Sequence, residues 1–507
     1  MKSIWDKLHK IGDFLHLPDL PAWVLGILAL VLILRIPTFF EPYYYGDEMI
    51  YLTLGQGVRQ GLTLYKDVYD NKPPLLYLTA AAAGNLFWFK TILCFWSIIT
   101  IIFFYKLAEK LFTKRKIVQI ASTSIFAILT TIPLFEGNTV NAELFMIGFT
   151  IIALYILLSD KLNSKRIYFA GLLFGLGTLF KVPAAFDAPI IVIYWLITND
   201  FKDWKKVIKN TFILALGFVT PILLSFIYFY FKGALSAYIN AAFLQNVGYL
   251  SSFRPGDIQK PFYIRNGPLL IRAGIVFAGI GILYLSRKKL SKNFILFCIW
   301  TLLGLFAVTL SERPYPHYFI QVIAPISFLF GMFFAERSIE QALVVIPLTV
   351  SFFVPVYYNF YHYSTINYYS RFINFAIGKS TKSEYLEGFS STVDRNYAIA
   401  KFLSQSSRET DRVFMWDSDS ATVYALSRRL PPIKFVADYH VTDYSNLATV
   451  AGQITTNPPK FIVLTSNRPY PDLIKLIKNK YFLINQIGNT DIYSRVDLAQ
   501  KINSVVK

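Results

Sequence analysis

A polar segment near the N-terminus concentrates side chains that can do acid–base chemistry. Asp47 and Glu48 follow the first apolar stretch of the chain directly. Further along the same segment, Lys72 precedes Pro73-Pro74, and the two prolines prevent a helix from running back through the lysine. The same polar segment thus supplies both a carboxylate and a cation. This pair can accept a proton from a hydroxyl group and stabilise an anionic leaving group.

The composition indicates that this segment belongs to a membrane protein. Of the 507 residues, 54% are hydrophobic and 17% are aromatic. These fractions exceed those of an ordinary soluble chain. The net charge of +19 comes from Lys and Arg residues that fall mostly in short loops between apolar spans. Because such loops are typical of the cytoplasmic side of a membrane, no nucleic-acid partner is inferred. The two cysteines lie far apart in apolar runs, so no disulfide framework is predicted.

Hydropathy predicts an α-helical polytopic membrane protein with about eleven spans. The spans are expected near residues 22–40, 90–107, 117–133, 143–159, 167–180, 184–198, 211–231, 268–285, 294–310, 316–334 and 342–360. The short, Ala-rich stretch 74–89 is expected to be an outer surface or re-entrant helix. Alternate loops are rich in Lys and Arg, which predicts a cytoplasmic N-terminus and an external C-terminus.

We expect three regions. Residues 1–21 form a cytoplasmic amphipathic segment, residues 22–360 the transmembrane domain with an outer loop at 41–89, and residues 361–507 a small extracytoplasmic α/β domain. In this last region, helices are predicted at 394–405 and 420–427, strands at 412–417 and 460–465, and a hairpin at 481–485 and 491–496. The region has no catalytic motif, so only support or acceptor recognition is assigned to it.

The outer loop resembles the first outer loop of the polytopic C-type glycosyltransferases that use polyprenyl-phosphate sugars. This group includes the protein O-mannosyltransferases and the aminoarabinose transferases of lipid A. The resemblance is carried by Asp47-Glu48 together with the run Asp70-Asn71-Lys72-Pro73-Pro74-Leu75-Leu76-Tyr77. It implies that Asp47 is the catalytic base and that Glu48 supports it or positions the acceptor. From the residues alone, both acids can equally cap the helix that begins at Glu48.

The second outer loop and the end of a later span hold further matches. Asn141 and Glu143 follow the family's Asn-x-Glu pattern, and the resemblance gives them, with Asp70, a part in positioning the sugar or the acceptor. Lys181 matches a family lysine that holds the donor phosphate, as Lys72 does, although valine rather than glycine follows it. The alternatives are a helix-capping role for Glu143 and an interfacial, snorkelling role for Lys181.

A third match lies at the outer start of a late span. Arg313, His317 and Tyr318 resemble the family's His-Tyr segment. The resemblance places Arg313 or His317 near the donor phosphate and gives Tyr318 a part in positioning the sugar or the acceptor. The alternative is a hydrogen-bonded histidine in an interfacial aromatic belt.

These patterns predict an inverting glycosyltransferase in a bacterial or archaeal cell membrane. It would move one sugar from an undecaprenyl- or dolichyl-phosphate donor to a hydroxyl acceptor on a protein, lipid or glycan at the outer face. No residue set forms an evident metal cage, and the need for a divalent cation is left open. The competing function is a transporter or flippase of a lipid-linked sugar, but such proteins tend to place charges near the midplane and to show inverted repeats. A membrane scaffold that only presents the C-terminal region would give the outer loop no reason for its composition.

Overall fold

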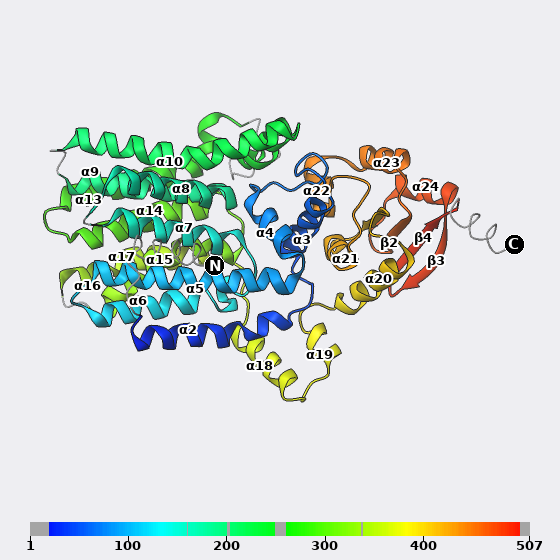
Figure 1. The fold of residues 1–507 in the computed structure, drawn as a ribbon, viewed down its shortest axis with the longest axis horizontal. Coiled ribbons are helices and arrows are strands. Elements are labelled where there is room, and N and C mark those ends of the chain that lie inside the picture. Colours follow the sequence, from blue (N-terminus) through cyan, green and yellow to red (C-terminus); the bar gives the residue numbers. More distant parts are fainter. Residues whose placement is uncertain (1–19, 160, 200–202, 249–259, 336–337, 497–507) are drawn as a thin grey trace, which may run out of the picture.

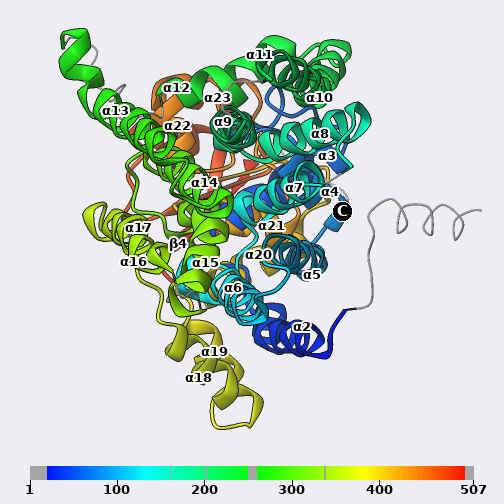
Figure 2. The ribbon, with the colours of Figure 1, turned by 90° about the vertical axis from the view of Figure 1, so that its left-hand side faces the viewer.

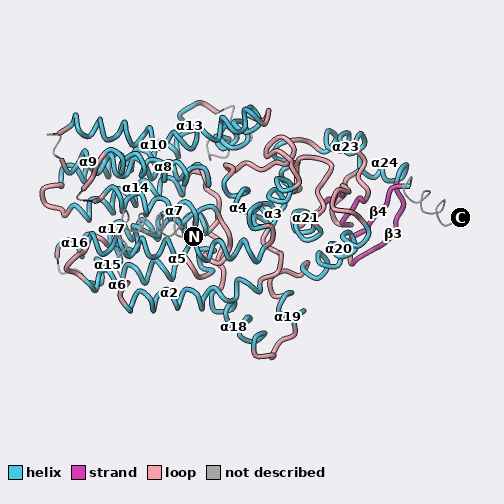
Figure 3. The backbone as a smooth tube through the Cα atoms, viewed as in Figure 1, coloured by secondary structure: helices cyan, strands magenta, loops and turns pink. Residues whose placement is uncertain are grey.

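The computed structural model describes residues 20–159, 161–199, 203–248, 260–335 and 338–496. The predicted N-terminal amphipathic segment falls outside these residues, apart from residues 20 and 21. The described chain forms a bundle of long helices, joined end to end with a mixed helical and sheet region (Figure 1). All strands lie in the part of the molecule that is remote from the bundle (Figure 3).

Apolar helices build the bundle. Within the described residues, seven segments are long and apolar enough to cross a membrane: α2 (Ala22–Arg35) with η1 (Ile36–Phe40), α5 (Leu86–Leu111), α10 (Trp204–Phe231), α13 (Phe262–Ser286), α14 (Lys292–Thr309), η6 (Pro316–Phe319) with α15 (Ile320–Ala335), and α16 (Ile339–Leu343) with α17 (Val345–Tyr357). Shorter helices stand among them, namely α6 (Lys116–Leu129), α7 (Ala142–Leu157), α8 (Ser164–Phe180) and η3 (Val182–Asp187) with α9 (Ala188–Thr198). Short connecting helices are η2 (Pro133–Phe135), α11 (Leu235–Ile239), η4 (Asn240–Leu244) and α12 (Gln245–Gly248).

Each of the eleven predicted spans overlaps one of these helices or helix pairs. Figure 2 shows the bundle end on, with α7 and α15 inside and α2, α10 and α13 at its margin. The side chains of α7 and α15 are mostly buried, whereas α13 exposes large apolar side chains such as Ile264, Ile271 and Phe277. An outer surface of this kind is expected where lipid surrounds a helix. The predicted polytopic helical fold of an integral membrane protein is confirmed.

Two helices outside the spans flank the loop that carries Asp70 and Lys72. They are α3 (Gly46–Arg59) and α4 (Leu75–Ala83), and they lie where the bundle meets the rest of the molecule (Figure 1). Gly55 brings them together, because an added Cβ at this position would lie 2.6 Å from the backbone nitrogen of Ala81. Any larger residue would push α3 away from α4, and with it Asp47 away from the loop that precedes α4.

The boundary between α4 and α5 corrects two predicted limits. Gly84 has a φ of +73° and ends α4, and the side chain of Asn85 accepts a hydrogen bond from the Trp88 amide at 3.0 Å to begin α5. A glycine in the left-handed region and an N-cap asparagine are stop and start signals. The second span therefore begins at Leu86 rather than at residue 90, and the short outer helix ends before residue 89.

The C-terminal region combines short helices with one sheet. Its elements are α18 (Thr365–Ala376), α19 (Lys382–Glu387), α20 (Val393–Ser406), β1 (Val413–Trp416), α21 (Ser420–Ser427), α22 (Asp438–Tyr444), α23 (Leu447–Thr456), β2 (Phe461–Thr465), α24 (Pro471–Lys480), β3 (Tyr481–Ile487) and β4 (Thr490–Arg495).

The sheet order is β1-β2-β4-β3, with β1 and β2 parallel and the other pairs antiparallel. The predicted helices coincide with α20 and α21, and the predicted strands and hairpin with β1 to β4. The sequence did not predict α18, α19, α22, α23 or α24. The limits predicted for the three regions, and the side of the membrane on which each lies, stay predictions.

Candidate active site

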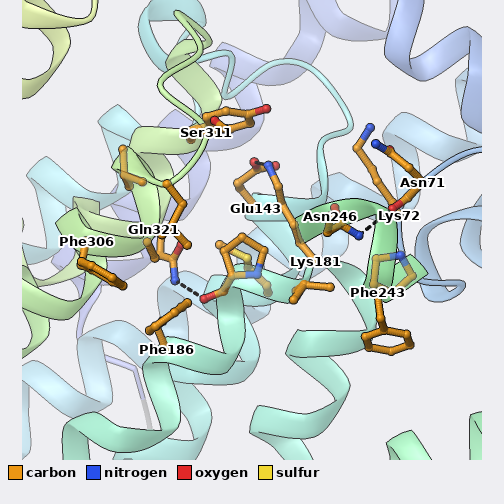
Figure 4. A pocket seen from close by; sticks show the side chains of 18 of the residues that line it. Asn71, Lys72, Glu143, Lys181, Phe186, Phe243, Asn246, Phe306, Ser311 and Gln321 are labelled. Atoms are coloured by element: carbon orange, nitrogen blue, oxygen red, sulfur yellow. Dashed lines mark hydrogen bonds and ion pairs between the residues drawn. The ribbon is translucent and has the colours of Figure 1, made fainter. Parts of the chain in front are cut away.

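A cavity of about 360 Å³ lies between the helix ends that face α4. Its polar lining includes Asn71, Lys72, Glu143, Lys181, Asn246 and Tyr318, and its apolar lining includes Met146, Phe186, Phe243, Leu269, Phe306 and Val308. Figure 4 shows the charged ends of Lys72, Lys181 and Glu143 on one side of the cavity and the rings of Phe186 and Phe243 on the other. The cavity is therefore amphipathic.

Asp47 and Lys72 face each other beside this cavity, and of the two only Lys72 lines it. The Asp47 Oδ2 atom accepts a hydrogen bond from the Tyr51 hydroxyl at 2.7 Å and lies 3.5 Å from the Lys72 Nζ atom. The lysine also lies over the Tyr51 ring, 4.9 Å from its centroid. The side chain of Asp47 is 29% exposed and that of Lys72 is 19% exposed, so both remain accessible to a bound molecule.

The environment keeps Asp47 ionised. Its burial by itself would raise the pKa of the carboxyl group, but the Lys72 ammonium, the charge of His317 and the Tyr51 hydrogen bond outweigh this effect. The resulting pKa of Asp47 is below its ordinary value. A carboxylate with such a pKa is present in its basic form at neutral pH.

Asp70 supports Lys72 from the other side. Its Oδ2 atom lies 3.9 Å from the Lys72 Nζ atom and accepts a hydrogen bond from the Tyr77 hydroxyl at 2.8 Å. The Tyr77 hydroxyl in turn accepts from the Lys72 backbone amide at 3.0 Å. Asp70 is buried, and although burial tends to raise its pKa, Lys72 and His440 bring the pKa well below the ordinary value. Asp70 does not line the cavity.

A second charged cluster joins the helix ends on the bundle side of the cavity. Lys181, at the end of α8, pairs with Glu143 at the start of α7, and its Nζ atom lies 3.8 Å from the centroid of the Tyr318 ring. His317 contacts Glu136 through Nδ1, and its Nε2 atom lies 3.8 Å from Glu143. The structure thus brings together Glu143, Lys181, His317 and Tyr318, which the sequence predicted from three separate loops.

Glu48 lies in a different environment from its neighbour Asp47. It is fully buried, its Oε1 atom is 2.6 Å from the Lys90 Nζ atom, and it accepts a hydrogen bond from the Val140 amide at 2.5 Å. The same lysine lies 2.8 Å from Glu41. Burial raises the pKa of Glu48 to about 6, an effect that Lys90 offsets only in part. Glu48 therefore ties α3 to α5 and does not line the cavity.

The comparisons with known proteins concern the family resemblance and the fold. Residues 71–230 match the family model described as dolichyl-phosphate-mannose-protein mannosyltransferase, and the match contains Lys72, Glu143 and Lys181. No curated protein matches the chain.

Among solved structures, ArnT from Cupriavidus metallidurans aligns in its apo state with a TM-score of 0.55 at 14% identity, and in its undecaprenyl-phosphate complex with 0.54 at 13%. Both alignments cover 94% of this chain and 98% of that chain. AglB of Archaeoglobus fulgidus, an archaeal oligosaccharyltransferase, gives a TM-score of 0.46 at 12% identity, over 94% of this chain and 74% of that chain.

The chain has the C-type glycosyltransferase fold. The resemblance that the outer loop carries is thereby confirmed. Asp47 lies outside the residues that the family model matches, so its place in the site depends on the contacts with Tyr51 and Lys72.

Six predicted site residues do not line the cavity of this glycosyltransferase fold, namely Asp47, Glu48, Asp70, Asn141, Arg313 and His317. Two of them, Asn141 and Arg313, also take no part in the contacts described above. Asn141 is buried at the start of α7, where its Nδ2 atom donates to Thr139 at 2.8 Å. Arg313 is exposed, and it does not line the cavity. Within the described residues, no group of three or more His, Cys, Asp or Glu side chains is placed to hold a metal ion.

Several residues of the site were missed by the sequence analysis. Glu136 accepts from the Tyr45 hydroxyl at 3.1 Å and contacts His317, and His440 reaches Asp70 from the C-terminal region. A signal existed for Lys90 and Gln321, because a charged or amide side chain within an apolar span is usually functional or structurally essential. For His440 there was no such signal, since it comes from a short helix that the sequence did not predict.

Proposed function

We propose that this protein is an inverting glycosyltransferase that moves one sugar from a polyprenyl-phosphate donor to a hydroxyl acceptor. The observation that carries the proposal is the pair formed by Asp47 and Lys72, because this lysine lines an amphipathic cavity together with a second lysine, Lys181. An ionised, partly exposed carboxylate next to cations matches the requirements of the reaction. The match of residues 71–230 and the shared fold with ArnT support it.

The donor fits the two halves of the cavity. Ligand cavities commonly measure about 300–1,000 Å³, and the volume of about 360 Å³ accommodates a phosphate head group with the first prenyl units. The side formed by Phe186, Phe243 and Phe306 suits the apolar chain, and Lys72 and Lys181 suit the phosphate. The Lys72 contacts of 3.5 and 3.9 Å are longer than the 2.7–2.9 Å of an optimal charged hydrogen bond, so the ammonium can turn to a phosphate oxygen.

In the proposed reaction, the acceptor oxygen attacks the anomeric carbon on the face opposite the phosphate. Asp47 takes the proton of the acceptor hydroxyl, the new carbon–oxygen bond forms, and the bond between the anomeric carbon and the phosphate oxygen breaks. The lipid phosphate leaves with the electron pair, and its growing charge is stabilised by Lys72 and Lys181. The configuration at the anomeric carbon is inverted in this single displacement.

The other predicted residues take supporting parts. Glu143 and His317 hold Lys181 in place, and Glu48 fixes the start of α3 so that Asp47 faces Lys72. We place the site at the outer face of a bacterial or archaeal cell membrane, with the N-terminus in the cytoplasm and the C-terminal region outside. The charge pattern of the loops supports this orientation.

The test is the Asp47→Asn substitution, which removes the proton-accepting group and keeps its size. The purified full chain is assayed in detergent. The donors are undecaprenyl-phosphate-linked hexoses and aminoarabinose, and the acceptors are a panel of hydroxyl compounds. Free lipid phosphate and bound donor are measured separately. We expect D47N to lose about 10²–10⁴-fold in the rate of lipid phosphate release, because a general base is absent, and to keep donor binding. Asp67→Asn is the matched control, since Asp67 is an exposed acid of the same loop.

Two results would contradict the proposal. Wild-type rates of release in D47N would exclude Asp47 as the base. Donor binding by the wild type without release of lipid phosphate, for every sugar and acceptor tried, would instead favour the flippase function.

A further inference from the structure

We propose that the C-terminal region completes the active site through His440, a positioning residue on α22 that holds Asp70 and, through it, Lys72. This inference rests on the proposed function, and it assigns a role to a part of the chain that has no catalytic motif of its own. His440 is not among the residues that line the cavity.

A continuous line of contacts leads from α22 to the candidate base. The His440 side chain is buried, and its Nε2 atom lies 3.3 Å from Asp70 Oδ1, which is within ion-pair distance but is not aligned as a hydrogen bond. The other oxygen of the same carboxylate, Oδ2, lies 3.9 Å from the Lys72 Nζ atom, which is 3.5 Å from Asp47. One buried carboxylate thus connects an element of the C-terminal region with the cation of the site.

Contacts with the C-terminal region hold the loop before Lys72 in place. The Tyr69 backbone amide donates to the Lys434 carbonyl at 2.9 Å, which places the loop beside the segment before α22. On the other side of Asp70, the Asn71 Nδ2 atom donates to the Tyr444 hydroxyl at 2.9 Å. The ring of Tyr69 packs edge to face against His440, with the ring centroids 5.6 Å apart. Three consecutive loop residues before Lys72 are therefore each held by the C-terminal region.

The energetics explain why the histidine matters for Lys72. A buried carboxylate is costly unless its oxygens are hydrogen-bonded or paired. Without His440, the Oδ1 atom of Asp70 keeps only the bond from the Asn71 backbone amide at 2.7 Å, and the carboxylate is free to rotate towards other donors. Because Lys72 is held by this carboxylate, its ammonium moves with it. Misplacement of a catalytic group by about 1 Å can cost about 10²-fold in rate.

The proposed role does not depend on the charge of the imidazole. A small rotation of the imidazole would align Nε2 with Asp70 Oδ1, and both the neutral tautomer protonated at Nε2 and the imidazolium can then donate to it. A glutamine side chain can place an amide nitrogen at a similar reach, whereas a methionine keeps the volume but has no donor. These two substitutions separate positioning by hydrogen bonding from simple packing.

The experiment compares H440M and H440Q with the wild type, and H362M is the matched control because His362 is exposed. The full chain is assayed for release of lipid phosphate from undecaprenyl-phosphate-linked sugars, and amide hydrogen exchange is followed in the loop of residues 64–77. In H440M we expect kcat to fall by about 10- to 100-fold, with a donor KM within about threefold, and faster exchange in this loop. H440Q should restore most of the rate and the protection, and H362M should behave as the wild type.

The proposal is overturned if H440M keeps the wild-type kcat and loop protection, or if H440M and H440Q lose both to the same extent. Hydrogen exchange needs no substrate, so it tests the positioning role even if the wild type releases no lipid phosphate. Absence of release by the wild type would contradict the proposed function and not the positioning role. If H440M does not fold, Y444F replaces it. This variant removes the hydroxyl that accepts from Asn71 and so tests whether the C-terminal region orders the loop. The His440 contact itself is then tested by H440F, which keeps a ring without a donor, and wild-type kcat and loop protection in H440F would overturn the proposal.

Discussion

Replacing Lys72 by methionine should move the acid limb of the pH–rate profile to higher pH. Lys72 has two parts in the proposed mechanism, because it stabilises the leaving phosphate and holds the pKa of Asp47 below its ordinary value. The two parts are separable in one measurement. Loss of phosphate stabilisation lowers the rate at every pH, whereas a change in the Asp47 pKa shifts the pH at which activity is lost.

The structure sets the size of the shift. Two unit charges 3.5 Å apart interact by about 5 kcal/mol at an effective dielectric constant of about 20. Asp47 and Lys72 are both partly exposed and Tyr51 also stabilises the carboxylate, so we expect the smaller effect that is usual for an acid beside one cation, about one to three pH units. Each unit corresponds to about 1.4 kcal/mol.

The sign follows from the direction of the pKa. The folded-state pKa of Asp47 is depressed, so the basic form is lost only as the pH falls well into the acid range. Without Lys72, this pKa rises and activity is lost at a higher pH. Asp70 acts in the same direction, since its charge then repels Asp47 without the intervening cation.

The assay is the pH dependence of kcat/KM for release of lipid phosphate, which reports groups of the free enzyme. Lys66→Met is the matched control, because Lys66 is an exposed lysine of the same loop and its removal changes the net charge equally. A K72M profile that is lower at every pH but has its acid limb at the wild-type position would refute the electrostatic coupling. A limb that also shifts in K66M would attribute the effect to the overall charge of the loop.

Two further predictions concern the frame of the site and its orientation. Replacing Lys90 by methionine leaves Glu41 and Glu48 buried without their cation, so we expect the free energy of unfolding to fall by about 3–5 kcal/mol. The measurement is the unfolding temperature in detergent, which should be lower than that of the wild type. An unchanged temperature would contradict a structural role for Lys90. Cysteines at the exposed positions Thr113 and Ser391, in a chain without the two buried native cysteines, should differ in intact cells. An impermeant thiol reagent should label only the Ser391 site, and labelling at Thr113 would reverse the predicted orientation.

The sequence predicted the elements that depend on local signals. Apolar length predicted the spans, and alternation with a Gly-Asn turn predicted the hairpin of β3 and β4 around Gly488. The start of α5 was predicted too late, although Gly84-Asn85 carried the correct signal. The helix α18 was not predicted, and two of its tyrosines join it to the bundle, because Tyr368 bonds to Glu41 and Tyr369 to the Leu34 carbonyl.

For the site residues too, local patterns in the sequence predicted some members, and contacts between distant segments were not predicted. Asp47 and Lys72 were predicted as a pair because one polar segment between apolar stretches carries both, 25 residues apart. The contacts of His317 with Glu136 and of His440 with Asp70 join residues from distant segments, so no local pattern specified them. Arg313 was predicted from a local resemblance, but the turn that carries it leaves its side chain exposed.

Asp47 and Glu48 show how the fold selects one of two adjacent acids for chemistry. Consecutive residues of a helix point about 100° apart, so only one of them can face Lys72. Glu48 turns inward, where contacts of 2.6 Å to Lys90 and 2.5 Å to Val140 engage one oxygen fully. Asp47 turns towards Lys72, and this longer contact leaves room for a third group. The environments move the two pKa values in opposite directions, which is typical of acids with different roles. This difference in environment is the reason for proposing Asp47 as the base and Glu48 as part of the frame.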